Sequence, residues 1–396
     1  MSDTETSETM TRLAIGGREI ILLGTAHVSR DSVDEVAQAI REEVPGRVCV
    51  EIDAARYRTM TEGQDWSSLN ISQVLRERKG FLLMANMVLS SFQRRLGADL
   101  GVTPGEEMRT AVAVANELGI PFSFVDREVN VTLRRAWARS GFWGKNKMLA
   151  ALFGSAVTRE KLTEEQIEGL KNKSALDGMM EELAGYLPSV KEVLIDERDR
   201  FLATRIFETT EPKVMAVVGA GHVKGIVHWL EQLAAGIADR DVSSLEEVPR
   251  PSRARKLLPW LIPLVIVALL AAGFLRSGWH TAISMIWVWV LVHGSLSALG
   301  ALLALSHPLT ILLAFVASPI TSLNPTIGVG IVTGIAEAFL RKPRVEDFEN
   351  LHNDMLSIRG FFRNRVTHIL VVFFLSSIGS AIGTFIGIPY LTALLA

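Results

Sequence analysis

The chain has 396 residues, which is enough for two domains, and its formal net charge at pH 7 is −2. This near-neutral balance gives no support for nucleic acid as a partner, because nucleic-acid-binding domains carry an excess of Lys and Arg. The single cysteine, Cys49, excludes an internal disulfide framework, and its apolar neighbours predict a buried small hydrophobic residue.

Apolar residues are distributed unevenly along the chain. Residues 1–10 are polar and acidic, and we expect them to be disordered. Residues 11–240 mix charged and apolar residues, as a soluble domain does, and residues 241–256 form a basic linker with two prolines. Residues 257–396 contain long apolar stretches with few charges, which predicts an all-α, multi-spanning transmembrane domain.

The first domain alternates short aliphatic runs with amphipathic stretches, which is typical of an α/β domain. The aliphatic runs predict strands at 20–23, 48–52, 122–125 and 214–218. The amphipathic stretches predict helices at 32–43, 106–118, 164–184 and 190–208. Polar residues follow each predicted strand, so a largely parallel sheet would bring them to one edge.

Two similar Gly-x-x-His sequences follow the first and the last of these strands. Gly24 precedes His27 and Gly219 precedes His222, while Glu51 ends the second strand. Two imidazoles and a carboxylate at one sheet edge predict a site for a divalent metal ion such as Mn, Co, Zn or Fe. The alternative is that each histidine is a hydrogen-bonded core residue.

The C-terminal region contains three or four apolar blocks. Residues 257–275 and 282–305 each reach the roughly 20 residues that one membrane span needs. The block 309–340 is longer than one span and is interrupted near Pro319 and Pro325, which predicts either two short spans or a broken helix. With the last block, 369–395, the total is about five spans.

Lys and Arg cluster in the linker and in residues 341–365, so both segments are expected on the cytoplasmic side, together with the first domain. In the last apolar block Gly379, Gly383 and Gly387 recur at every fourth position and predict a helix contact face. Glu337 lies in an apolar stretch; an ion pathway is one interpretation, but we favour a pair with Arg341 near the membrane interface.

Two further segments combine apolar and basic residues, at 80–97 and 134–153. Each can lie on a membrane surface or form a contact in a homodimer. The alternative for both is ordinary core packing. We therefore expect membrane lipid as a partner, with a homodimer as a further prediction.

Five motifs occur along the chain: Gly24-Thr25-Ala26-His27-Val28-Ser29, Val50-Glu51-Ile52-Asp53 followed by Arg56, Pro104-Gly105-Glu106-Glu107-Met108-Arg109, Asp126-Arg127 with Thr132-Leu133-Arg134-Arg135, and Gly219-Ala220-Gly221-His222. Together they resemble the TraB/PrgY family, which is related to the Tiki and GumN proteins. The C-terminal region, with Ser318-Pro319, Asn324-Pro325 and Arg341-Lys342-Pro343, also resembles the prokaryotic membrane-anchored branch of this family.

The resemblance implies a Tiki-like metalloprotease or hydrolase domain with a membrane anchor. It implies a mixed sheet flanked by helices, as in erythromycin-esterase and ChaN-like proteins. The family's histidines and acidic residue map onto His27, His222 and Glu51. Family members that shut down peptide pheromones bind or degrade small peptides, so a peptide or small amide is the expected substrate.

The expected reaction is metal-assisted hydrolysis of a peptide or related amide. Glu51 is expected to be catalytic as well as a ligand. Arg56 or Arg127 would stabilise the oxyanion, and Glu106 or Glu197 would transfer the proton. Each has a simpler interpretation: Glu106 as a first-turn helix acid, Arg127 in an internal pair, and Glu197 in solvated ion pairs. Two other functions stay open, namely peptide sequestration without cleavage, and transport.

Overall fold

The computed structural model describes residues 4–6, 9–25, 30–62, 71–77, 105–141, 144–145, 147–148, 185, 187–249, 257–324, 327–344, 346–347, 350–354 and 357–395. The chain divides into two compact units. The sheet unit comprises residues 1–64 and 92–250, and the helical unit comprises residues 65–91 and 251–396.

The sheet unit is built on a mixed sheet of six strands in the order β1-β2-β3-β6-β4-β5. Four parallel strands match the predicted ones: β3 (Arg18–Thr25), β6 (Lys213–Gly219), β4 (Arg47–Val50) and β5 (Phe122–Phe124). Two antiparallel strands, β1 (Thr4–Thr6) and β2 (Met10–Ile15), extend the sheet at its β3 edge. Within the segment 1–10, residues 4–6 form β1 and Met10 begins β2, while residues 1–3 and 7–8 lie outside the described residues.

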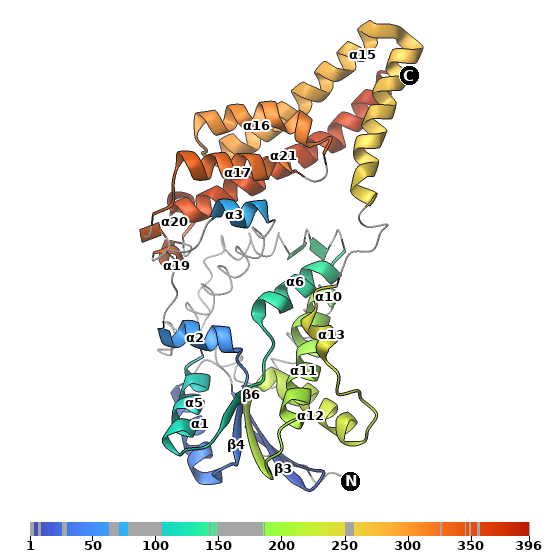
Figure 1. Ribbon diagram of the computed structural model, residues 1–396. Coiled ribbons are helices and arrows are strands. Elements are labelled where there is room, and N and C mark those ends of the chain that lie inside the picture. The colour runs from blue at the N-terminus through green and yellow to red at the C-terminus, as the bar shows by residue number, and fades with distance from the viewer. Residues whose placement is uncertain are drawn as a thin grey trace. The chain divides into compact units, whose positions relative to one another are not determined.

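Helices cover both faces of this sheet (Figure 1). On one face lie α1 (Arg30–Glu43) and α5 (Glu106–Glu117), and on the other lie α11 (Glu197–Phe207) and α12 (Ala220–Ala234). Side chains of β3 alternate between the two cores: Ile20 and Leu22 face α11 and α12, and Ile21 and Leu23 face α1 and α5. Each such burial stabilises the fold by about 1.5–3 kcal/mol.

Shorter helices complete the sheet unit. They are α2 (Ala54–Glu62), α6 (Val129–Arg139), α10 (Pro188–Lys191) and α13 (Ser243–Glu246). A π-helical turn, η2 (Glu192–Asp196), joins α10 to α11, so the helix predicted at 190–208 is present but interrupted. The predicted helix at 164–184 and the segment 80–97 lie outside the described residues, as does much of 134–153. Cys49 is fully buried, which confirms its assignment to the core.

The helical unit begins with a 3-10 turn, η3 (Leu258–Trp260), that leads into α15 (Leu261–Leu303). Gly278 bends α15 sharply, with φ 78°, between the two apolar blocks predicted from sequence (Figure 1). The unit continues through α16 (Pro308–Thr321), α17 (Val329–Leu340), α19 (Leu351–Asp354), α20 (Ile358–Arg363) and α21 (Arg365–Ala393), and α3 (Ile71–Arg76) packs on α17. The predicted interruption within 309–340 therefore falls between α16 and α17.

Among the described residues, two helices are long and apolar enough to cross a membrane, judged by length and composition only: Leu258–Leu303 and Arg365–Ala393. Between them lie the shorter apolar helices α16 and α17. The glycine spacing in α21 forms a contact face, as predicted. A Cβ on Gly379 would lie 2.2 Å from the Leu296 carbonyl oxygen of α15, so the two helices approach within the same chain. This internal contact gives the glycines a role that needs no second copy.

Glu337 is fully buried within the helical unit. Its pair with Arg341 is present, with Nε 3.2 Å from Oε1. The carboxylate also accepts hydrogen bonds from the Thr310 hydroxyl at 2.6 Å and from the His307 N–H at 3.1 Å. These donors lie at the N-terminus of α16, where a carboxylate interacts favourably with the helix dipole. Glu337 thus joins α17 to the start of α16.

Candidate functional site

The carboxyl ends of the parallel strands lie side by side. Thr25 at the end of β3 pairs with Gly219 at the end of β6, and Val50 of β4 pairs with Val217 of β6. Glu51 directly follows β4, and His222 lies in the first turn of α12, directly after β6. The predicted convergence of Glu51 and His222 is therefore present. Residues 26–29, including His27, lie outside the described residues, and the role of His27 stays a prediction.

His222 is held between two carboxylates. Its Nδ1 lies 2.5 Å from Asp199 Oδ1, and its Nε2 lies 3.5 Å from Glu51 Oε1. The other Glu51 oxygen accepts a hydrogen bond of 2.6 Å from the Gly219 N–H. Burial lowers the pKa of His222, but the Glu51 charge and the Asp199 hydrogen bond outweigh it, so the pKa lies above its usual value. Burial also raises the pKa of Asp199.

Gly24 contributes to this site by close packing. A Cβ at Gly24 would lie 3.1 Å from the Val223 side chain and 3.4 Å from the Ala220 Cα. The absence of a side chain there lets the end of β3 lie against the first turn of α12, which carries His222. The glycine of the first motif thus helps to position the histidine of the second.

Arg198 occupies the centre of the site, although sequence reasoning assigned it no role. Its Nη2 lies 2.7 Å from Glu51 Oε1 and 2.6 Å from Asp126 Oδ2, and its Nη1 lies 3.2 Å from His222 Nε2. Burial opposes the charged form, but the two carboxylates raise the pKa of Arg198 above its usual range. A guanidinium fixed beside an imidazole and two carboxylates can neutralise negative charge on a bound group.

Asp199 is the second site residue that sequence reasoning missed. It is buried on α11, and it packs against Gly225 one turn after His222 on α12. A Cβ at Gly225 would lie 1.9 Å from Asp199 Oδ2. The sequence signal was the run from Asp196 to Arg200, whose alternating charges are equally typical of a solvated helix. The π-helical turn η2 immediately before α11 is a feature often found at functional sites.

Glu197 and Arg127 bind to each other in a buried pair, and their catalytic roles stay predictions. Glu197 pairs with Arg127 at 3.0 Å and with Arg135 at 2.7 Å, and all three side chains are buried. Arg127 also donates to the carbonyl oxygens of Leu245 and Val193. Burial would raise the pKa of Glu197, but hydrogen bonds from Arg135 and Arg127 lower it below its usual value. The internal pair proposed for Arg127 is present, whereas the solvated surroundings favoured for Glu197 are not.

Arg56 and Glu106 lie in the first turns of α2 and α5. The Arg56 N–H is bonded to Asp53 Oδ1 at 2.9 Å, and its side chain is half-buried. Glu106 pairs with Arg109 at 3.3 Å, an arrangement that fits a first-turn helix acid. Their catalytic roles stay predictions.

No group of three or more His, Cys, Asp or Glu side chains suited to a metal ion occurs among the described residues. A metal site that includes His27 would use a residue outside the described part of the chain. Glu51 and the Nε2 atom of His222 are nevertheless adjacent, and they are of the ligand types that divalent metals accept in proteins.

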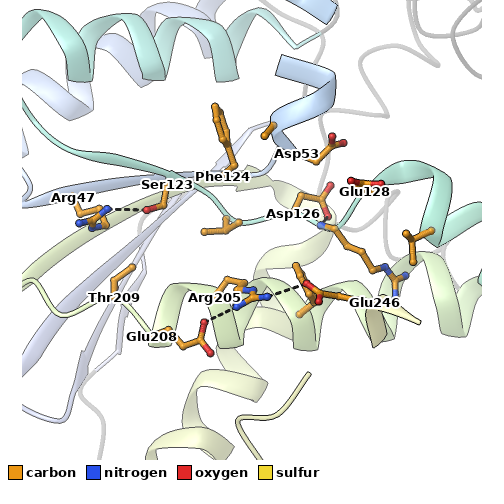
Figure 2. Close-up of a pocket in the computed structure, with 15 residues that line it drawn as sticks. Arg47, Asp53, Ser123, Phe124, Asp126, Glu128, Arg205, Glu208, Thr209 and Glu246 are labelled. Carbon is orange, nitrogen blue, oxygen red and sulfur yellow. Dashed lines mark hydrogen bonds and ion pairs between the residues drawn. The ribbon is translucent and has the colours of Figure 1, made fainter. Parts of the chain in front are cut away.

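A cavity of about 770 Å³ adjoins the site (Figure 2). It is bounded by β5, by the face of α11 that carries Phe201, Arg205 and Glu208, and by the loop from Asp126 to Glu128. Figure 2 shows Asp53, Asp126 and Glu128 gathered at one end of the cavity. Asp126 belongs to both regions, because it lines the cavity and binds Arg198. A ligand in the cavity would therefore extend to the edge of the site.

Comparison with known proteins supports the sequence resemblance. The chain is 34% identical over 375 residues to an uncharacterized protein of Methanocaldococcus jannaschii, covering 93% of each chain. It is 29% identical to a TraB domain-containing protein of Bos taurus, over 70% of this chain and 78% of the relative. The corresponding Homo sapiens protein is 29% identical over 69% of this chain and 78% of its own length.

Two family models match the chain in succession. The model described as TraB family protein, C-terminal domain, matches residues 254–396. The model described as TraB/PrgY/gumN family matches residues 9–237, which are more than half of the chain. The chain belongs to the TraB/PrgY/gumN family.

Proposed function

We propose that this protein is a membrane-anchored, metal-dependent hydrolase that acts on a peptide or a related amide. The observation that carries the proposal is the arrangement of His222, whose Nδ1 is held by Asp199 while its Nε2 faces Glu51 and Arg198. A carboxylate on the second nitrogen of an imidazole is the usual support for a metal-binding histidine, because it fixes the tautomer and the ring orientation.

The metal-binding set that we propose is His222, Glu51 and His27. The first two are ligand types that divalent ions accept, and an ion bound to them would replace the contacts of Arg198 with Glu51 Oε1 and His222 Nε2. Strand β3, which precedes His27, ends beside Gly219. When bound, such an ion supplies Lewis-acid polarisation and lowers the pKa of a coordinated water. Proton and metal compete for His222, so metal affinity should increase with pH through the raised pKa of this residue.

The protein residues have separate roles in this proposal. Asp199 orients His222, and the Gly219 N–H orients Glu51. Arg198, rather than Arg127, is placed to stabilise negative charge that develops on the substrate carbonyl oxygen. Glu51 would also transfer a proton at the site, whereas His222 would have both ring nitrogens engaged, by Asp199 and by the metal ion. Glu197 serves as the buried partner of two arginines.

The helical unit is the proposed membrane anchor. Its two long apolar helices are the support for this assignment. Basic residues in the linker and in residues 341–365 favour a cytoplasmic position for the sheet unit.

The first test measures metal content. The full chain is purified in a non-ionic detergent and its metals are quantified by elemental analysis, for the wild type, His222→Ala and Glu51→Gln. We expect a divalent metal in the wild type and its loss in both variants. His228→Ala is the matched control, because His228 is an exposed histidine on the same helix. Metal retention by both site variants would refute the proposed ligand set.

The second test uses mass spectrometry to follow a defined peptide mixture incubated with the metal-loaded chain. We expect cleavage fragments with the wild type and with His228→Ala, and none with His222→Ala. Tight binding of peptides that remain intact would identify a sequestering protein instead. Equal cleavage by all three proteins would show that the site does not carry the activity.

A further inference from the structure

Strand β5 forms one edge of the sheet, and no described strand pairs with its outer side. The inner side pairs with β4, through the hydrogen bonds from Val48 N–H to Pro121 C=O and from Val125 N–H to Val50 C=O. Parallel pairing alternates along a strand, so the main-chain groups of Phe122 and Phe124 point away from β4. No hydrogen bond to these outward groups occurs among the described residues. Such an edge can accept an added strand.

The cavity of about 770 Å³ lies along this same strand. Ser123 and Val125 line it from β5, and Phe201, Arg205 and Glu208 line it from α11. Its volume is within the range of about 300–1,000 Å³ that is typical of ligand sites. A segment paired with β5 would therefore have a space beside it for alternate side chains, which is the arrangement by which proteins recognise extended peptides.

The charge of the cavity lining indicates which kind of segment it would bind. Its lining contains three arginines and five carboxylates, which are Asp53, Asp126, Glu128, Glu208 and Glu246. Arg205 is engaged by Glu208 at 3.0 Å and by Glu246 at 2.9 Å, whereas Glu128 is exposed and has no ion pair among the described residues. Asp53, Asp126 and Glu128 lie together at one end (Figure 2). A positively charged side chain on the ligand would compensate this excess.

We propose that the cavity beside β5 binds an extended, basic peptide segment that adds to the sheet as a further strand. This inference rests on the proposed function and specifies its substrate. Asp126 links the two regions, because it lines the cavity and binds Arg198. A basic side chain at the acidic end would place the neighbouring peptide bond toward Arg198 and Glu51.

The test measures binding separately from cleavage. The probe is a fluorescein-labelled octapeptide of alternating lysine and valine, and its fluorescence anisotropy is followed with the full chain in a non-ionic detergent. The comparison peptide has glutamate at every lysine position. We expect the glutamate peptide to bind at least about tenfold more weakly, because charges juxtaposed with like charges oppose association. Equal binding of the two peptides would overturn the proposal.

Two N-methylated versions of the probe test strand addition. One is methylated on the lysine nitrogens and the other on the valine nitrogens. In an added strand, alternate residues direct their main-chain groups toward β5. We therefore expect one version to lose about tenfold or more in affinity, from at least two lost hydrogen bonds, while the other binds like the parent. An equal effect in both versions, or no effect in either, would refute pairing with β5.

A protein variant locates the charge contact. Glu128→Gln should weaken binding of the lysine peptide by about two- to fivefold, as the loss of one exposed ion pair does. Glu117→Gln, an exposed glutamate on α5, is the matched control and should leave binding unchanged. Equal affinities of the two variants would place the peptide elsewhere. Selective binding without cleavage would contradict the proposed hydrolase alone, whereas cleavage that ignores charge and methylation would contradict only the binding mode.

Discussion

Replacing Gly225 with alanine tests its contact with Asp199, because an uncrowded glycine and a crowded one predict changes in stability of opposite sign. Alanine at an ordinary helix-interior glycine stabilises a protein by about 0.5–1 kcal/mol, because glycine loses more backbone entropy on folding. At position 225 the added Cβ would lie 1.9 Å from Asp199 Oδ2 and 2.4 Å from Cγ. Ordinary van der Waals contact begins at 3.4 Å, so the carboxylate would have to withdraw by about 1.5 Å. We therefore expect Gly225→Ala to destabilise the sheet unit.

The expected size of this destabilisation follows from the hydrogen bond that is lost. A withdrawal of this size would lengthen the bond of 2.5 Å between Asp199 and His222 beyond hydrogen-bonding distance. Loss of a hydrogen bond between charged groups costs about 1.5–3 kcal/mol. After the helix-propensity gain is subtracted, the net destabilisation is about 0.5–2.5 kcal/mol, and protection of α12 amides should fall by about 2- to 70-fold.

Hydrogen-exchange mass spectrometry of the full chain in detergent measures this protection in peptides from α11 and α12. Gly141→Ala is the control, because nothing lies within 4 Å of a Cβ there. Combining Gly225→Ala with Asp199→Ser removes the carboxylate, and in that background the alanine should become neutral or stabilising. Higher protection in the single variant Gly225→Ala would refute the contact between Gly225 and Asp199.

Three further predictions concern other buried groups of the sheet unit. Glu197→Gln should destabilise this unit by about 3–5 kcal/mol, because two buried arginines lose their partner. Glu192→Gln, at an exposed pair, should cost less than about 1 kcal/mol. Similar losses of hydrogen-exchange protection in the two variants would contradict the buried network. Burial raises the pKa of the Cys49 thiol to about 12, so iodoacetamide should label it only after unfolding, and rapid labelling of the native chain would disprove its burial. A hydrogen bond from Arg12 is the main cause that lowers the pKa of Glu43 to about 2. The stability that Glu43 contributes should therefore be present above pH 4.5 and decline as pH falls toward 2. Glu43→Gln should remove that part of the acid sensitivity, measured by equilibrium unfolding.

Much of the sheet unit could be predicted from local sequence patterns. The aliphatic runs located the four parallel strands, because a strand buried on both faces must be apolar at successive positions. The grouping of the polar residues that follow these runs could then be predicted from topology, since parallel strands end at one edge of the sheet. This topology predicts that Glu51 and His222 lie together, as they do in the structure. The edge strands β1 and β2 were missed, because short polar strands gain their stability from pairing.

The run from Glu197 to Asp199 separates what the sequence determined by itself from what only the tertiary structure decided. Its three charged residues are adjacent in the chain, and local sequence predicts only a charged helix. In the folded protein Glu197 binds Arg127 and Arg135, Arg198 binds Glu51 and Asp126, and Asp199 binds His222. Successive helical side chains point about 100° apart, so the rotation of α11 against the sheet sets each partner. The sequence determined which charges α11 carries and where the strands end, and tertiary packing decided which charge enters the site.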